Sequence, residues 1–166
     1  MNEHELGDFY RRIGAAIWHL QYLEDILVNF LCLKTVHERR CSGDTVLMPD
    51  AEALIAEKRK LTLGLLIESC KSRKIILPEI RARFDAFKIE RDWLVHRSMI
   101  ESGDDLYLET TRNGVFSRIA AIQEEARSLG AVIVQDLQSW VASHGVDLPT
   151  VNSQAANAIR KLKGID

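Results

Sequence analysis

Hydrophobic side chains recur every three or four residues along most of the chain, which is the spacing of one face of an α-helix. In the first part, this pattern predicts a helix from about Glu5 to Leu33 with one broad apolar stripe. A polar stretch, His37 to Asp50, separates it from a second predicted helix, about Ala51 to Ser72. The first 72 residues are therefore expected to form two helices with a polar connection.

The second part of the chain shows the same spacing with one interruption. A third helix is predicted to begin at Pro78, because proline suits the first turn of a helix. Apolar and polar residues then alternate over Ser98 to Thr110, which predicts a small hairpin or extended loop. A fourth long helix is predicted over Val115 to Ser143, and a short helix in the polar tail that starts at Val146.

Four amphipathic helices with short to medium connections favour an all-α fold, namely an antiparallel up-and-down four-helix bundle. The length of 166 residues is common for one domain. The expected organisation is a helical bundle over residues 1–145, followed by a C-terminal tail over residues 146–166.

Composition narrows the classes of function. A net charge of −2 argues against a surface that binds nucleic acid everywhere, so any site for RNA is expected to be local. Three cysteines without paired spacing indicate free thiols, and the first residues lack an apolar signal segment, so a cytoplasmic protein is expected. No apolar run approaches the roughly 18 residues of a membrane span. Cys32, His37 and Cys41 match no common zinc pattern, and neither metal nor cofactor is expected.

Arg91 occupies an unusual position in the third predicted helix. On an ideal α-helix it lies about 20° from Ile80, near the middle of the apolar stripe. An unpaired guanidinium there would be costly to bury, so a carboxylate or an anionic ligand is expected beside it. Glu24, within the apolar stripe of the first helix, is the candidate partner, although such a pair can also be purely structural.

His96 follows Arg91 on the same helix. Asp92 precedes His96 by four residues, so its carboxylate is expected to orient the imidazole. Arg91 and His96 are five residues apart and diverge by about 140° on an ideal α-helix. Their side chains meet only if the arginine curls around the helix, if the helix distorts, or if a second copy of the chain faces the first across a two-fold axis.

The segment Arg91-Asp92-Trp93-Leu94-Val95-His96 resembles the Arg-x4-His motif of the HEPN superfamily, a group of helical nucleotide-binding domains of higher eukaryotes and prokaryotes. Its context is similar as well: an apolar filling before the histidine, a place late in the third of four helices, and the segment Trp18 to Glu24 in a long first helix. The resemblance implies a homodimeric, metal-independent endoribonuclease of the kind found in toxin–antitoxin, phage-defence and RNA-processing systems.

The resemblance also implies roles for single residues. His96 would transfer the proton and Arg91 would stabilise charge on the phosphate when a ribose 2′-hydroxyl attacks the adjacent phosphorus. Asp92 would orient these groups, and Glu24 would support Arg91. RNA, a second copy of the chain and an antitoxin protein are the expected partners. Local basic residues would hold the RNA, namely Arg97, Arg81 and Arg83.

Two other functions remain open. The chain can be a HEPN-like module without catalysis that binds a nucleotide, RNA or a protein partner, or an unrelated helical interaction protein in which Arg91 and Glu24 form a structural pair. Three aromatic residues lie outside the main apolar stripes and are expected to seal a dimer or, less favourably, to stack on bases: Trp18, Tyr22 and Trp93.

Overall fold

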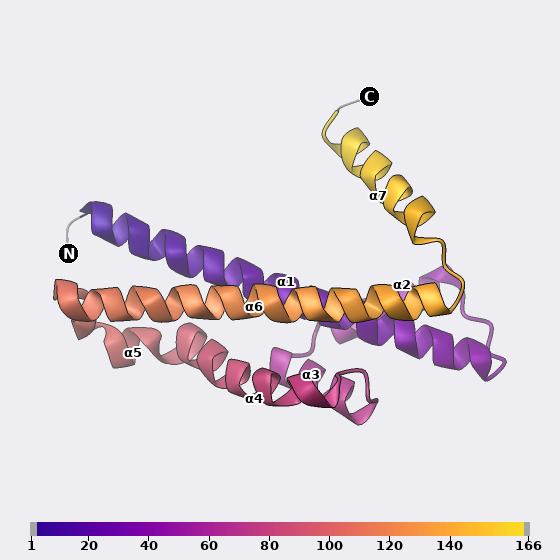
Figure 1. The fold of residues 1–166 in the computed structure, drawn as a ribbon, viewed down its shortest axis with the longest axis horizontal. Helices are drawn as coiled ribbons and strands as arrows, with labels where there is room; N and C mark the ends of the chain where they lie inside the picture. The colour runs from indigo at the N-terminus through magenta and orange to yellow at the C-terminus, as the bar shows by residue number, and fades with distance from the viewer. Residues whose placement is uncertain (1–2, 165–166) are drawn as a thin grey trace. The chain divides into compact units, whose positions relative to one another are not determined.

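The computed structural model describes residues 3–164, and every regular element in this range is helical (Figure 1). The predicted all-α class is therefore confirmed. In chain order the elements are α1 (Glu3–Cys41), α2 (Met48–Lys58), α3 (Leu63–Ser72), α4 (Pro78–Asp92), the π-helical turn η1 (Trp93–Arg97), α5 (Ser98–Ser102), the 3-10 turn η2 (Asp104–Leu106), α6 (Glu109–Ser143) and α7 (Leu148–Leu162).

The chain divides into two compact units, and the division lies within α6. The first unit ends at Ala131 and the second begins at Val132. The second unit contains the last turns of α6 and the predicted tail helix, observed as α7. Gly145 has a φ of +79°, a left-handed conformation that glycine adopts at low cost, and it forms the turn between the two helices. The predicted domain boundary at residues 145 and 146 lies in this turn.

Helix α1 extends beyond the predicted Leu33 to Cys41, so part of the polar stretch is helical. The sequence has no glycine or proline between Leu33 and Gly43, and Gly43 has a φ of +91°, in the left-handed region. Arg39 and Arg40 lie in the last turn, where positive charge interacts favourably with the helix dipole. The polar residues here belong to the exposed end of α1 and not to a connection between helices.

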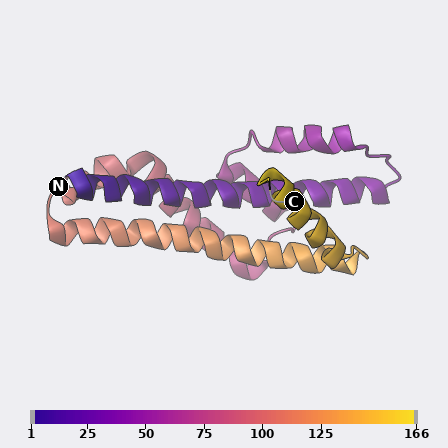
Figure 2. The same cartoon turned by 90° about the horizontal axis from the view of Figure 1, so that it is seen from above.

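The second predicted helix is in fact two helices, α2 and α3. Thr62 interrupts it: its hydroxyl oxygen accepts a hydrogen bond from the backbone N–H of Leu65 at 3.4 Å and so caps α3. At the start of α2, the Asp50 carboxylate accepts a hydrogen bond from the N–H of Leu47 at 3.0 Å. Both helices pack on α1. The chain reverses its direction at the break between them (Figures 1 and 2).

As a result of this reversal, α1 and the first part of α6 run in the same direction (Figures 1 and 2). Near their starts, Arg112 donates to Glu5 at 2.8 Å, and the rings of Phe9 and Phe116 lie 6.1 Å apart. The predicted up-and-down order, in which the first and last long helices are antiparallel, is not observed in the first unit.

Helix α4 runs against the first part of α6. Early in α4, Arg83 donates to Glu125 at 2.9 Å, and late in α4, Glu90 accepts from Arg118 at 2.7 Å. The apolar stripe of α4 is buried as predicted, with Ile80, Phe84 and Phe87 in the core. This antiparallel pairing fixes the end of α4, and with it the segment that carries the candidate site.

The predicted hairpin over Ser98 to Thr110 is wrong. This segment contains α5, the 3-10 turn η2 and the start of α6, which begins at Glu109 instead of Val115. Alternation marks a strand when one of its faces is buried, and Leu106 is the only residue buried in this segment. Met99 and Ile100 are exposed, so the alternation here does not correspond to two faces of a strand.

None of the helices in the described part of the chain is both long enough and apolar enough to cross a membrane.

Candidate active site

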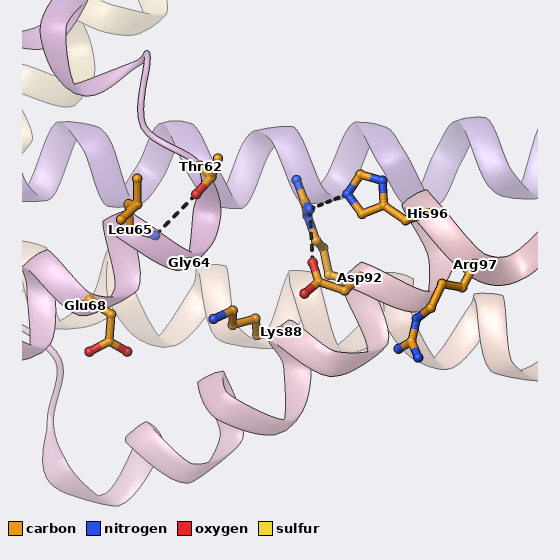
Figure 3. Close-up of a pocket in the computed structure, with 9 residues that line it drawn as sticks. Thr62, Gly64, Leu65, Glu68, Lys88, Asp92, His96 and Arg97 are labelled. Carbon is orange, nitrogen blue, oxygen red and sulfur yellow. Dashed lines mark hydrogen bonds and ion pairs between the residues drawn. The ribbon is translucent and has the colours of Figure 1, made fainter.

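An open cavity of about 560 Å³ lies in the first unit between α3 and the end of α4. Figure 3 shows Asp92, His96 and Arg97 on one side of it and Thr62, Leu65 and Glu68 on the other. Four of the residues predicted to act together line this single cavity. The complete lining is Thr62, Gly64, Leu65, Glu68, Lys88, Arg91, Asp92, His96 and Arg97.

The π-helical turn η1 brings Arg91 and His96 together. The Nη1 atom of Arg91 lies 3.3 Å from Nε2 of His96. In a π-helix the hydrogen bonds join residues five apart, so positions five apart come to one side of the helix, whereas in an α-helix they diverge. The helix therefore distorts at the motif, and a second copy of the chain is not required for this contact.

The local sequence explains how the wider turn is held. The backbone N–H of Ser98 donates to the carbonyl of Trp93, five residues earlier. The carbonyl of Leu94, which would accept this N–H in an α-helix, instead accepts the side-chain hydroxyl of Ser98 at 2.8 Å. Trp93 and Leu94 are both buried, so consecutive residues anchor the turn in the core. The prediction that Trp93 lies outside the core is wrong.

Arg91 is surrounded by acidic groups as well as by His96. Its Nη1 atom donates to Oδ1 of Asp92 at 3.1 Å, and its Nη2 atom lies 3.8 Å from Oε1 of Glu24 on α1. The side chains of Arg91 and Glu24 are 21% and 29% exposed, so both retain access to solvent. The predicted partner is present, at the distance of an ion pair without a direct hydrogen bond.

Burial raises the pKa of Glu24 above its ordinary value of 4.5, and the nearby Arg91 offsets part of this effect. The folded protein therefore binds a proton at Glu24 more readily than the unfolded chain does. The favourable contribution is fully present below the ordinary pKa and is lost as the pH rises through the raised one. At neutral pH the buried carboxylate makes a net cost to the folded state.

The variant Glu24→Gln is expected to gain stability relative to the wild type as the pH rises above about 4.5. Glutamine keeps the shape of the side chain and carries no charge that burial penalises. Urea unfolding of both proteins at several pH values between about 4 and 8 measures the difference. A difference that stays constant over this range would contradict the prediction, because it would show that the pKa of Glu24 is the same in the folded and the unfolded protein.

Asp92 contacts Arg91 and forms no hydrogen bond with His96 among the described residues. The π turn accounts for this, because it moves His96 away from the position four residues after Asp92. A guanidinium has donors only, so Nε2 of His96 is the acceptor in the contact with Arg91, and a neutral ring then carries its proton on Nδ1. Asp92 was expected to orient His96, but in the structure Arg91 contacts His96 and Asp92 contacts Arg91.

The three predicted RNA-binding residues do not lie together in the structure. Arg97 lines the cavity and pairs with Glu101 at 3.3 Å. Arg81 and Arg83 lie early in α4 and do not line it. Arg83 is committed to Glu125 through two hydrogen bonds of 2.9 and 3.0 Å. Of the three, Arg97 alone is placed to contact a ligand in the cavity.

Lys88 and Gly64 were not among the predicted site residues, yet both line the cavity. Lys88 precedes Arg91 by one helical turn, and residues three apart are neighbours on a helix surface. That spacing was a usable signal for Lys88. No comparable signal marked Gly64, because the sequence pattern did not separate α3 from α2.

Comparison with protein families, curated proteins and solved structures yields no match for this chain. The resemblance to HEPN proteins therefore rests on the sequence motif and its context. In chemical terms, the cavity combines a proton acceptor, a guanidinium beside it and two further cations, Lys88 and Arg97, in an open space. Such a set fits a phosphate group that undergoes proton-coupled chemistry.

Proposed function

We propose that this chain is a metal-independent endoribonuclease of the HEPN type. The contact of 3.3 Å between Arg91 and His96 within one open cavity is the observation that carries the proposal. Cleavage of RNA by its own 2′-hydroxyl requires a group that moves a proton and a group that stabilises negative charge, and these two residues supply both. The Arg-x4-His spacing and the helical fold support the same conclusion.

In the proposed reaction, the bound phosphate draws the Arg91 guanidinium away from Nε2 of His96. The freed Nε2 then accepts the proton of the ribose 2′-hydroxyl. The 2′-oxygen forms a bond to the adjacent phosphorus, and the bond from phosphorus to the 5′-oxygen of the next nucleotide breaks. The leaving 5′-oxygen takes a proton from the imidazolium or from water. Arg91 donates to the phosphoryl oxygens, where charge develops, and the products are a 2′,3′-cyclic phosphate and a 5′-hydroxyl.

The resemblance extends the proposal to partners and setting. The partners are RNA, a second copy of the chain that forms a homodimer, and an antitoxin protein. The fold is a HEPN-type bundle, and the setting is the cytoplasm, in a toxin, phage-defence or RNA-processing role. Trp18 and Tyr22 are large, exposed aromatics one turn apart on α1, and they suit a dimer contact.

The test is cleavage of mixed RNAs by the purified protein in excess chelator, with analysis of the product ends. The wild type is expected to produce 2′,3′-cyclic phosphates. The variant His96→Ala is expected to lose about 100- to 10,000-fold in rate, because the proton acceptor is removed. The exposed His4 gives a matched control, and His4→Ala is expected to cleave at the wild-type rate.

Other outcomes contradict the proposal in distinct ways. If no RNA is cut, or if His96→Ala cuts as fast as the wild type, catalysis at this site is excluded. RNA binding without cleavage would favour the non-catalytic module. Cleavage that disappears in chelator would exclude the metal-independent mechanism.

A further inference from the structure

The charged residues that line the cavity are almost all paired. Glu68 pairs with Lys71 at 3.1 Å, Asp92 with Arg91 at 3.1 Å, and Arg97 with Glu101 at 3.3 Å. Lys88 is the exception: among the residues that the structure describes, it has no ion pair and no hydrogen bond. Its ammonium group is thus available to an anion that enters the cavity.

The position of Lys88 is set by Gly64. A Cβ atom at Gly64 would lie 3.1 Å from Cε and 3.4 Å from Nζ of Lys88, so the lysine side chain rests against α3 where a side chain is missing. Figure 3 shows Lys88 close to Gly64, on the side of the cavity away from His96. Gly64 lies in the first turn of α3, the positive end of that helix, which supplies no negative charge to balance the ammonium.

Lys88 and Arg91 are one turn apart on α4, with Cβ atoms expected about 5–6 Å apart. This separation is similar to that between successive phosphates of an RNA strand. A strand that places one phosphate at Arg91 can therefore place the neighbouring phosphate at Lys88. The two cations line the same open cavity of about 560 Å³.

We propose that Lys88, resting against Gly64, binds the phosphate next to the one that Arg91 and His96 engage, so that the cavity holds two consecutive phosphates of one RNA strand. This inference rests on the proposed function, because it assumes that the ligand is RNA. It adds a requirement: besides the phosphate that is cleaved, the preferred substrate carries a second phosphate next to it.

Two variants test the position and the charge separately. Lys88→Ala removes the ammonium. Gly64→Ala places a methyl group against Lys88 and displaces the flexible end of that side chain, which costs little energy. Alanine also favours a helix more than glycine does, so Gly64→Ala is expected to fold at least as stably as the wild type. Lys60→Ala, an exposed lysine outside the cavity lining, is the matched control.

The first measurement compares kcat/KM for a dinucleotide, which has one phosphate, with kcat/KM for two trinucleotides, which have two. One trinucleotide carries the additional nucleotide on the 5′ side of the cleaved bond, and the other carries it on the 3′ side. The wild type is expected to prefer one of the trinucleotides by about fivefold, the size of one exposed charge pair. In Lys88→Ala and Gly64→Ala this ratio is expected to fall to about 1, while Lys60→Ala keeps it. Equal ratios in the wild type and Lys88→Ala would overturn the inference and leave the proposed function intact.

The second measurement does not depend on cleavage. Fluorescence anisotropy gives the Kd of a 12-nucleotide RNA in which every 2′-hydroxyl is methylated, at several salt concentrations. Loss of one phosphate contact is expected to lower the slope of log Kd against log salt by about 0.7 in Lys88→Ala. A lower slope without any cleavage by the wild type would refute the nuclease and support the phosphate site. An unchanged slope would overturn the site.

Discussion

Replacement of Arg91 by alanine is expected to lower kcat for RNA cleavage by about 100- to 1000-fold, the effect of removing one donor to a developing oxyanion. In the structure this guanidinium lies 3.3 Å from His96 and 3.1 Å from Asp92. Its loss removes both the charge on the phosphate side and the donor that orients the imidazole. Single-turnover cleavage at saturating protein measures the chemical step separately from RNA binding.

Two further variants separate this effect from damage to the fold. Arg91→Ala leaves the half-buried Glu24 without its cation, so the double variant Arg91→Ala with Glu24→Gln is the control with the carboxylate neutralised. It is expected to be as inactive as Arg91→Ala and more stable. Arg91→Lys keeps a positive charge but has no planar fork to contact Asp92 and His96 together, so it is expected to rescue little activity. Full activity in Arg91→Lys would show that only the positive charge of Arg91 is needed.

Replacement of Trp93 by alanine is expected to lower the free energy of unfolding by about 3–5 kcal/mol, the range for removal of a large buried aromatic side chain. Trp93 is 1% exposed. The guanidinium of Arg118 lies 3.7 Å from the centre of its ring and is itself held by two hydrogen bonds to Glu90. The substitution removes both the packing and the surface on which Arg118 rests.

Urea unfolding followed by circular dichroism measures this change, because the signal does not depend on tryptophan. Tyr107, which is 72% exposed, is the matched aromatic control, and Tyr107→Ala is expected to change stability by less than about 0.5 kcal/mol. Similar losses in the two variants would contradict the burial of Trp93. RNA cleavage by Trp93→Ala is expected to fall as well, because Trp93 anchors the turn that places His96.

The helices that the sequence predicts best are those with an uninterrupted apolar stripe. Helix α4 begins at Pro78 as expected, and its buried residues Phe84 and Phe87 follow the predicted spacing. The division between α2 and α3 was missed, because apolar spacing continues across it and no glycine or proline marks it. The hydroxyl of Thr62 makes the break, through a single local hydrogen bond that a periodic pattern does not reveal.

The sequence predicts which candidate residues lie together where this depends on spacing along one helix, and it fails where this depends on the type of helix. Arg91, Asp92, His96 and Arg97 line one cavity, as expected of residues in one short segment. The predicted contact between Asp92 and His96 is wrong, because α-helical spacing does not hold in the π turn. Arg83 was chosen for its charge alone, and its pairing with Glu125 depends on α6, which lies far away in sequence.

The π turn also has a consequence for how a spacing motif is recognised. In a regular α-helix, a functional pair on one face would be separated by three intervening residues, and four intervening residues would place the pair on different faces. An Arg-x4-His segment thus brings its two side chains together only where its helical turn contains one extra residue. A local marker of that extra residue is the hydroxyl of Ser98, which takes over the carbonyl of Leu94. Such a marker indicates occurrences of the spacing in which the two side chains can meet.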